Sequence, residues 1–307
     1  MSKSLLKRTV HWLKQFIRDP EYKLAQVALR FVDEEKLPDR MVIKYQFHRV
    51  FGHPLDLRHP KTFSEKLQWL KLHGRNPLYT TLVDKYRVKQ WVADKIGEQY
   101  VIPTLAVYNS VDEIDLDKLP DKFVLKCNHD SGSVVICRDK SAFDFEAAKR
   151  ILQKCLDTNF YLKHREWPYK NVKRCVIAEE YLESNQDDLR DYKFFCFSGK
   201  VKFFKIDTGR FHNHLAFYFN CDGSRLPWGG EIALFDPDKT VEVPNNLPKL
   251  IDMAESLSSA FPFVRVDFYT ENSFVKFGEM TFFPGAGLIK YTDEEFDEFA
   301  GGQMRVG

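Results

Sequence analysis

Two acidic residues near the end of the chain lie in otherwise apolar segments. Asp267 lies within residues 263–269 and Glu279 within residues 275–283, and both segments are rich in Phe and Val. If both segments are strands joined by a loop with an odd number of residues, the two carboxylates can face each other on one face of a sheet. Facing carboxylates repel unless a proton or a cation neutralises them. A hard divalent cation such as Mg²⁺ suits oxygen ligands, and with few protein ligands it normally binds substrate phosphates as well.

The neighbours of this pair leave two interpretations open. Strand alternation places Arg265 on the same face as Asp267, so an internal ion pair could neutralise the carboxylate without a metal ion. Thr281 follows Glu279 by two residues, and the loop 283–287, Phe-Pro-Gly-Ala-Gly, is typical of a tight turn beside a binding site. These two features favour the metal site.

A lysine and a loop of small residues form a second candidate site. Lys126 lies in the strand-like segment 123–127, on the face opposite the apolar side chains, where a charge needs a partner. The loop that follows contains Ser131, Gly132 and Ser133, whose amides and hydroxyls could hold phosphate oxygens. An ordinary hairpin turn is the alternative interpretation. The P-loop and the glycine motif of dinucleotide-binding folds are both absent from the sequence.

The elements that must position these residues follow an order typical of an α+β protein. Thr62 and Glu65 have the spacing of a capping box and predict the start of a helix. A second helix is predicted to run from Leu82 to Ile96. Residues 119–182 have the pattern strand, loop, strand, helix, strand. Further strands follow, including a hairpin with its turn at residues 198–199.

Composition excludes several classes of function. The 307 residues include 46 Lys and Arg against 44 Asp and Glu, so no overall charge favours nucleic acid as a partner. The six cysteines include no C-x-x-C pair, which favours buried thiols in a reducing compartment over disulfides or a zinc site. No segment approaches the length of a membrane span, and no secretory signal is recognisable. We therefore expect a cytoplasmic protein.

The first 18 residues carry five basic side chains and no acidic one, with apolar residues at helical spacing. This pattern predicts a basic amphipathic helix. The helix could pack against the protein or another subunit, or it could bind in the plane of the inner face of the cytoplasmic membrane. The sequence leaves the oligomeric state open.

Taken in chain order, several segments resemble the TupA-like ATP-grasp proteins of surface-polysaccharide and teichuronopeptide biosynthesis. The resemblance begins near Tyr45, extends to the C-terminus, and is carried by DKFVLKCNHDSGS, REWPYK, DYKFFCF, RVDFY and FGEMTFFPGAG. It implies an α+β ATP-grasp fold, in which two α+β lobes close over ATP after a helical N-terminal region. The implied division is residues 1–110 for the helical region, 111–185 for the small lid lobe, and 186–307 for the C-terminal lobe with the metal site.

The resemblance also implies a role for each candidate residue. Lys85 and Lys126 would contact the phosphates of ATP. The loop that covers the phosphates would contain Ser131, Gly132 and Ser133. The segment along the adenine would contain Glu179, Tyr181 and Leu182, with Asp191 or Glu183 at the ribose. Candidate catalytic residues are Lys193, Arg210 and Arg265, and candidate Mg²⁺ ligands are Asp267, Glu279 and Thr281. Many ATP-grasp ligases have Asn where this chain has Thr281, which offers only a hydroxyl oxygen.

The implied function is an ATP- and Mg²⁺-dependent ligase that joins a carboxylate to an amine through an acyl phosphate. The implied partners are a uronic-acid-containing surface polysaccharide or its precursor, which supplies the carboxylate, and an amino acid or other amine. Two alternatives remain at this stage. One is a kinase that phosphorylates a glycan hydroxyl, and the other is a non-catalytic adaptor for polysaccharide assembly.

Overall fold

The structure, a computed structural model, describes residues 19–183, 189–209, 213–226, 236, 238–271 and 274–307. The predicted N-terminal basic helix and Arg210 lie outside these ranges. Within them, no helix has the length and apolar character needed to cross a membrane.

In the described part of the chain, five α-helices precede the first strand. They are α2 (Pro20–Phe31), α3 (Asp39–Phe51), α4 (Phe63–His73), α5 (Leu78–Val83) and α6 (Val88–Ile96). The predicted capping box is confirmed, because Thr62 accepts a hydrogen bond from the Glu65 amide and the Glu65 carboxylate accepts one from the Thr62 amide. The prediction of one continuous helix from Leu82 to Ile96 is wrong. The Asp84 carboxylate accepts hydrogen bonds from the amides of Tyr86 and Arg87, so it ends α5 and holds the turn that separates α5 from α6.

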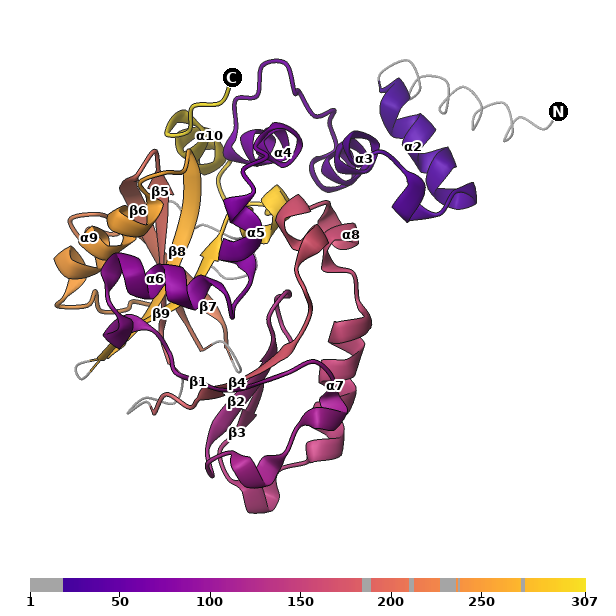
Figure 1. Cartoon of the computed structure of the whole chain (residues 1–307). Coiled ribbons are helices and arrows are strands. Elements are labelled where there is room, and N and C mark those ends of the chain that lie inside the picture. Colours follow the sequence, from indigo (N-terminus) through magenta and orange to yellow (C-terminus); the bar gives the residue numbers. More distant parts are fainter. Residues whose placement is uncertain (1–18, 184–188, 210–212, 227–235, 237, 272–273) are drawn as a thin grey trace.

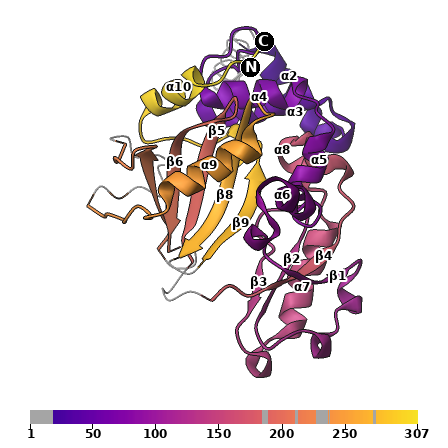
Figure 2. The ribbon, with the colours of Figure 1, turned by 60° about the vertical axis from the view of Figure 1, so that its left-hand side comes forward.

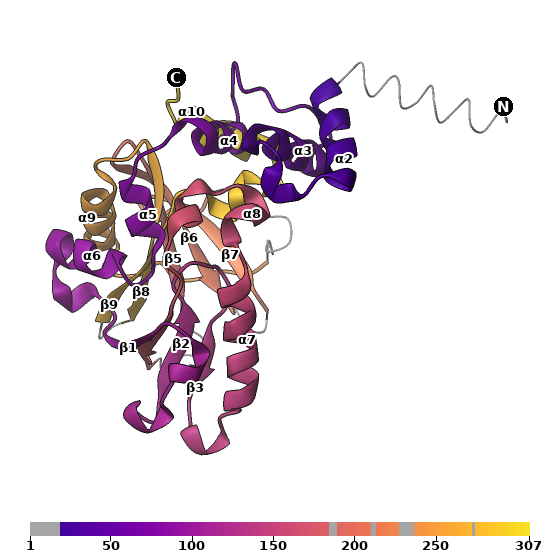
Figure 3. The same ribbon diagram turned by 45° about the vertical axis from the view of Figure 1, so that its right-hand side comes forward.

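The first sheet has the strand order β1-β4-β2-β3, with all neighbours antiparallel. Its strands are β1 (Thr104–Tyr108), β2 (Phe123–Cys127), β3 (Val135–Cys137) and β4 (Val176–Glu180), and α7 (Phe145–Asp157) and α8 (Phe160–His164) connect β3 to β4. Leu152 of α7 packs with Phe123 and Leu125 in one apolar cluster. Because side chains alternate along a strand, Lys126 lies on the opposite face, as predicted. Figure 3 shows α7 running alongside β2 and β3.

The second sheet has the order β7-β6-β5-β8-β9, also with antiparallel neighbours. Its strands are β5 (Asp191–Phe197), β6 (Lys200–Thr208), β7 (Leu215–Asn220), β8 (Phe263–Glu271) and β9 (Phe274–Thr281). Figure 2 shows α9 (Leu247–Ser258) lying across this sheet. The predicted hairpin turn is confirmed: Ser198 and Gly199 have φ angles of 49° and 77°, as the turn between β5 and β6 requires.

Short 3-10 helices occupy several connections. They are η1 (Glu34–Lys36), η2 (Glu98–Tyr100), η3 (Val111–Glu113), η4 (Leu116–Lys118), η5 (Lys140–Ala142), η6 (Trp167–Asn171) and η8 (Pro284–Gly287). The last helix, α10 (Glu294–Gly302), packs against α4. Figure 1 shows the second sheet and its helices above the first sheet, with α7 on the outer side of the first.

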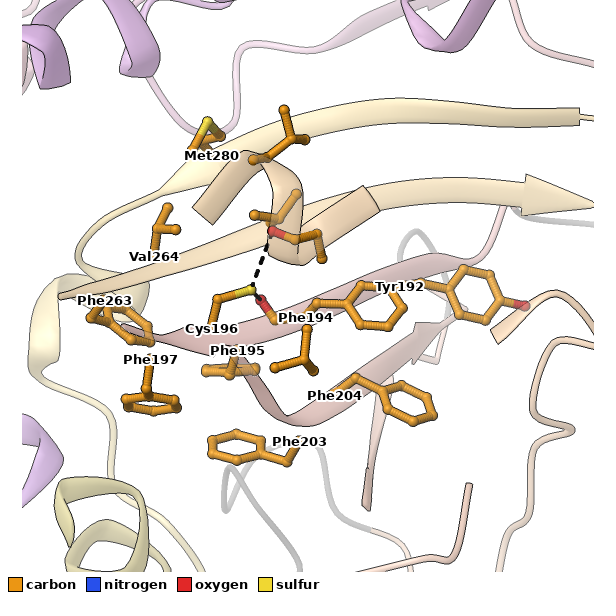
Figure 4. Close-up of a cluster of buried hydrophobic side chains, with 14 of the residues drawn as sticks. Tyr192, Phe194, Phe195, Cys196, Phe197, Phe203, Phe204, Phe263, Val264 and Met280 are labelled. Carbon is orange, nitrogen blue, oxygen red and sulfur yellow. Dashed lines mark hydrogen bonds between the residues drawn. The ribbon is translucent and has the colours of Figure 1, made fainter. Parts of the chain in front are cut away.

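Phenylalanine side chains build the core of the second sheet (Figure 4). Phe195 and Phe203 stack across β5 and β6 with ring centroids 4.6 Å apart, and Phe63 of α4 meets Phe263 at 4.9 Å. On the other face, the Cys196 thiol lies 3.9 Å from the Ala254 carbonyl of α9. All seven residues of β5 are buried, so any charged side chain on this strand must find its partners inside the protein.

Candidate active site

The two carboxylates predicted to face each other do so. Asp267 of β8 is paired in register with Glu279 of β9, and the register shifts by one residue immediately after Asp267. Gly278 permits this close approach, because a Cβ atom there would lie 3.2 Å from the Asp267 carbonyl oxygen. The strand pairing therefore brings two acidic side chains together in an apolar sheet.

Arg265 binds both carboxylates. Its Nε donates to Asp267 Oδ1 at 2.7 Å, and its Nη2 donates to Asp267 Oδ2 at 2.6 Å and to Glu279 Oε1 at 2.9 Å. Thr281 Oγ1 accepts from the same Nη2 at 3.0 Å and donates to Glu279 Oε1 at 3.0 Å. The internal ion pair that the sequence left open is thus present, and Thr281 orients Glu279.

Lys193 joins this cluster from the neighbouring strand β5, where it is paired in register with Asp267. Its ammonium group contacts the Asp191 carboxylate and lies 3.2 Å from Asp267 Oδ2 and 3.5 Å from Asp207 Oδ2. Burial disfavours the charge, but the three carboxylates outweigh burial and raise the pKa of Lys193 above its usual range. Lys193 is therefore a permanently charged, buried cation within the site.

Glu279 is the member of the cluster that is most open to a ligand. Its side chain is 36% exposed, and within the described residues its Oε2 makes no hydrogen bond or ion pair. Burial opposes ionisation, but the charges of Lys85, Arg265 and Lys193 lower the pKa of Glu279 to about 2. Glu279 thus fits a hard divalent cation. Both oxygens of Asp267 are already bound by Arg265 and Lys193, so Asp267 fits such a cation only if one of these partners moves away.

Lys85 connects the carboxylates to the loop between β2 and β3. It lies in the turn between α5 and α6, donates from its amide to the Asn128 carbonyl at 2.9 Å, and contacts the Asp130 carbonyl through its ammonium group. The charge of the same lysine also lowers the pKa of Glu279, so Lys85 interacts with both the loop 128–133 and the carboxylate pair. Its contact with phosphate stays a prediction.

The three residues of the small-residue loop, 131–133, differ in burial. Ser133 is buried: its amide and hydroxyl donate to the Asp130 carboxylate at 3.1 and 2.7 Å, and its hydroxyl accepts from the Cys127 amide. Ser131 and Gly132 are exposed. Gly132 has φ +119°, a conformation that other residues rarely adopt, and open space surrounds the position of a Cβ atom. Ser131 and Gly132 can therefore meet a ligand, whereas Ser133 holds the loop in shape.

Lys126 forms an ion pair that the sequence did not reveal. Its Nζ lies 2.5 Å from Oε2 of Glu179 on β4, and Lys89 Nζ of α6 lies 2.7 Å from the other carboxylate oxygen. Lys89 also donates to Thr104 Oγ1 at 2.5 Å. Burial alone would raise the pKa of Glu179, but the positive charges of Lys126 and Lys89 have the larger effect. The pKa of Glu179 is therefore lowered, which keeps its side chain ionised. Lys89 is a candidate site residue that sequence reasoning missed, although it follows Lys85 by one helical turn.

The remaining predicted residues lie at the ends of β4 and β5. The Tyr181 hydroxyl accepts from Arg138 Nε at 3.3 Å, and Leu182 is half-buried beside it. Of the two residues predicted for the ribose, Glu183 is exposed and lies 2.5 Å from Lys122, whereas Asp191 is buried against Lys193. Asp191 therefore belongs to the cluster around Lys193. The cavity of about 530 Å³ between α6 and β1 includes Lys89 in its wall but none of the predicted residues.

A buried acid and base beside Glu279 were also missed. Lys71 of α4 donates to the carbonyls of Ala286 at 2.7 Å and His164 at 2.9 Å, and burial lowers its pKa to about 8. Burial raises the pKa of Glu166 to about 7, opposed by the charge of Lys71 and reinforced by that of Glu279. The helical position of Lys71 on the buried face of α4 is the only sequence signal for this pair.

Comparison with known proteins found one matching family model, described as TupA-like ATPgrasp, over residues 65–305. Solved structures with a similar fold include D-alanine–D-alanine ligase from Bacillus anthracis complexed with ATP, at 14% identity and a TM-score of 0.38, covering 66% of this chain and 53% of that one. The Helicobacter pylori D-alanine–D-alanine ligase is 13% identical with a TM-score of 0.45, covering 80% and 70%.

The ATP-grasp ligase PsnB, complexed with a precursor variant, Mg and ADP, is 11% identical with a TM-score of 0.38, covering 71% and 56%. The chain thus spans about half of the length of the first of these structures. No curated protein matches the chain.

Proposed function

The chain belongs to the TupA-like ATP-grasp family, as its sequence predicted, and from this premise we propose that it is an ATP- and Mg²⁺-dependent ligase that joins a carboxylate to an amine. The observation that carries the proposal is the pairing of Asp267 with Glu279, in which Glu279 keeps one carboxylate oxygen open. Because this oxygen lies on a side chain that is 36% exposed, Glu279 can bind a cation without giving up its contacts with Arg265 and Thr281.

The residues around this pair suit the transfer of a phosphoryl group. Glu279 would hold Mg²⁺, and Asp267 would join it as a second ligand after release of one cation; the bound ion would offset the negative charge of the phosphates. Lys193, already charged and 3.2 Å from Asp267, is placed to turn toward a phosphate. Lys85 and the amides of Ser131 and Gly132 would bind phosphate oxygens from the side of the first sheet.

The proposed reaction has two steps. The γ-phosphoryl group passes from ATP to a carboxylate oxygen of the acceptor, which releases ADP and forms an acyl phosphate. The amine attacks the acyl carbon, phosphate leaves, and the amine nitrogen loses a proton as the amide forms. Fixed positive charge from Lys193 and Arg265 stabilises the negative charge on the transferring group.

The acceptor that we propose is a uronic-acid-containing surface polysaccharide or its precursor, and the second substrate is an amino acid or another amine. Support for this choice comes from the resemblance of five sequence segments to proteins of surface-polysaccharide biosynthesis. We further propose that residues 111–185, with β1 from the preceding segment as the edge strand of their sheet, act as the lid lobe over residues 186–307, with residues 1–110 as the mainly helical region that precedes them. Lys85 supports this arrangement because it contacts the loop of the lid while lowering the pKa of Glu279.

A cytoplasmic location with peripheral membrane contact through residues 1–18 completes the proposal. Its support is the run of five basic side chains without an acidic one. Flotation with anionic liposomes, with and without these residues, tests it: equal flotation of both forms would exclude the contact.

An ADP-release assay tests the proposed function itself. ADP that forms only when a uronate-containing glycan and an amine are both present supports the ligase. ADP that forms together with a phosphorylated glycan hydroxyl would identify a kinase instead. Absence of ADP with every acceptor, from protein that binds ATP, would favour the non-catalytic adaptor.

A further inference from the structure

Three potential metal ligands meet outside the candidate active site, at the base of the loop between β2 and β3. Cys127 ends β2, His129 lies two residues further on, and Cys155 lies on α7. The two sulfur atoms and a ring nitrogen of His129 lie within 4.8 Å of one another. Around a tetrahedral Zn²⁺ with bonds of about 2.0 to 2.3 Å, ligand atoms lie roughly 3.4 to 3.8 Å apart. Small rotations of the three side chains would bring their ligand atoms to the distances that Zn²⁺ requires.

His129 is the observation that points to a ligand. It is 1% exposed, and neither Nδ1 nor Nε2 has a hydrogen-bond partner of normal geometry within the described residues. The carbonyls of Cys155 and Thr158 are near the ring without meeting that geometry. Leaving a buried polar group without a partner costs about 1–3 kcal/mol, so native structures rarely tolerate it. A metal ion bound to one ring nitrogen would remove much of this cost.

The two thiols and a nearby carboxylate complete the surroundings. Cys127 is fully buried, and the pKa of Cys155 is raised by its contact with the Cys127 thiol, by burial, and by the Asp130 carboxylate. Each cysteine would bind the cation as a thiolate, so a thiol proton would be released on binding. Asp130 accepts hydrogen bonds from the amide and the hydroxyl of Ser133 and lies outside this group of three, so the fourth position would be left to water.

We propose that Cys127, His129 and Cys155 bind a thiophilic divalent cation, for which Zn²⁺ has the fitting ligand preference. Two thiolates and one imidazole from two separate elements would tie the end of β2 to α7. The metal would thereby fix the loop 128–133, which Lys85 contacts at Asn128 and Asp130. The binding of metal stands independently of the proposed ligase activity, and the effect on loop order is its structural consequence.

Metal titration of the full-length chain, prepared metal-free and kept reduced, tests the site without ATP. Co²⁺ serves as the spectroscopic probe, since tetrahedral thiolate ligation produces intense visible bands and a sulfur-to-metal charge-transfer band. We expect one Co²⁺ per chain, displacement by one Zn²⁺, and a higher melting temperature with Zn²⁺. The reductant prevents a Cys127–Cys155 disulfide from forming in place of the metal site.

Matched cysteine variants separate the site from non-specific thiol binding. Cys155→Ser, on the partly exposed helix α7, should weaken Zn²⁺ binding at least about 100-fold, and His129→Gln should do the same. Cys137→Ser and Cys175→Ser change buried thiols outside the cluster and should leave Zn²⁺ affinity unchanged. Circular dichroism verifies that each variant is folded. Absence of the charge-transfer band in the wild type, or equal Zn²⁺ affinity in Cys155→Ser and Cys137→Ser, would overturn the proposal.

Amide hydrogen exchange provides a second readout. Removal of Zn²⁺ by a chelator should increase exchange in residues 128–133 of the wild type and leave exchange of Cys155→Ser unchanged. If exchange in this loop is insensitive to chelation in the wild type while Zn²⁺ is bound and released, the assigned effect on the loop is refuted. Neither result depends on turnover, so failure here is distinguishable from failure of the ligase proposal.

Discussion

Asp267 and Glu279 lie opposite each other on β8 and β9, and the guanidinium of Arg265 binds both, yet the two carboxylates differ in exposure. The Asp267 side chain is 2% exposed with both oxygens bound, whereas the Glu279 side chain is 36% exposed and one of its oxygens has no hydrogen bond or ion pair to any residue that the structure describes. A carboxylate without a free oxygen stabilises its neighbours, and one with a free oxygen can bind a ligand. This difference predicts different consequences for the two neutral amide variants.

Glu279→Gln should abolish Mg²⁺-dependent ATP turnover while changing the free energy of unfolding by less than about 1 kcal/mol, because the lost ion pair is partly solvated. Denaturant unfolding and turnover are measured side by side, with Glu298→Gln, at an exposed position of α10 outside the predicted site, as a control that should alter neither. Turnover of Glu279→Gln within twofold of the wild type would contradict its assignment as the Mg²⁺ ligand.

Asp267→Asn should instead destabilise the fold by about 3–5 kcal/mol, since it leaves Arg265 and Lys193 buried without their shared counterion. Urea unfolding monitored by tryptophan fluorescence measures the change. A loss below about 1 kcal/mol would show that water or another residue compensates the two cations, and that Asp267 is available to a metal as the structure stands.

Lys126→Met should weaken ATP binding at least tenfold, or about 1.4 kcal/mol, while the protein stays folded. The fold is expected to survive because Glu179 keeps its second partner, Lys89, at 2.7 Å. Isothermal titration calorimetry with Mg²⁺-ATP measures the affinity. Lys118→Met removes an exposed lysine of η4 whose partner, Asp115, lies outside the predicted site, and it should bind ATP as the wild type does. Equal affinities for the two variants would remove Lys126 from the nucleotide site.

Mg²⁺-ATP should protect the loop between β2 and β3 unevenly. The amides of Ser131 and Gly132 should exchange more slowly with nucleotide, because these exposed residues gain phosphate partners only then. The Ser133 amide already donates to Asp130 and should change little. Amide-resolved exchange by NMR distinguishes these positions. Uniform behaviour of the three amides with and without Mg²⁺-ATP would argue against a phosphate-covering loop.

Glu166→Gln should flatten the pH dependence of stability between about pH 4.5 and 7. Because burial raises the pKa of Glu166 to about 7, the folded state binds a proton that the unfolded state has lost, and stability falls as the pH rises through this window. The neutral amide removes that loss, which amounts to at most about 3 kcal/mol. Urea unfolding across the pH range measures it, and the exposed Glu180→Gln is the control. An unchanged pH profile would show that Glu166 titrates normally.

Local patterns predicted those parts of the fold that depend on neighbouring residues. Strand alternation placed Asp267 and Glu279 on one face, and the spacing of Thr62 and Glu65 predicted the start of α4. Both inferences use a periodicity of two to four residues, which the chain carries locally. The sequence did not predict the helix break at Asp84, because an aspartate can interrupt a helix or occupy a solvent-facing position within one.

Pairings between distant segments were not predictable from such patterns. Lys193 meets Asp267 because β5 lies beside β8, and a strand order of β7-β6-β5-β8-β9 cannot be read from alternation. Lys89 reaches Glu179 across the junction of a helix and the first sheet. Cys155 approaches Cys127 only because α7 folds back on β2, which explains why the absence of a C-x-x-C pair suggested isolated thiols.

Isotope transfer from the acceptor tests the central claim, formation of an acyl phosphate from a carboxylate at this site. A uronate-containing oligosaccharide labelled with ¹⁸O in its carboxyl groups is incubated with the protein, an amine and Mg²⁺-ATP, and the released phosphate is analysed by mass spectrometry. The ligase account predicts one ¹⁸O atom in each phosphate released per amide formed, and none with Glu279→Gln. Unlabelled phosphate accompanying the amide, or a phosphorylated hydroxyl in place of the amide, would contradict it.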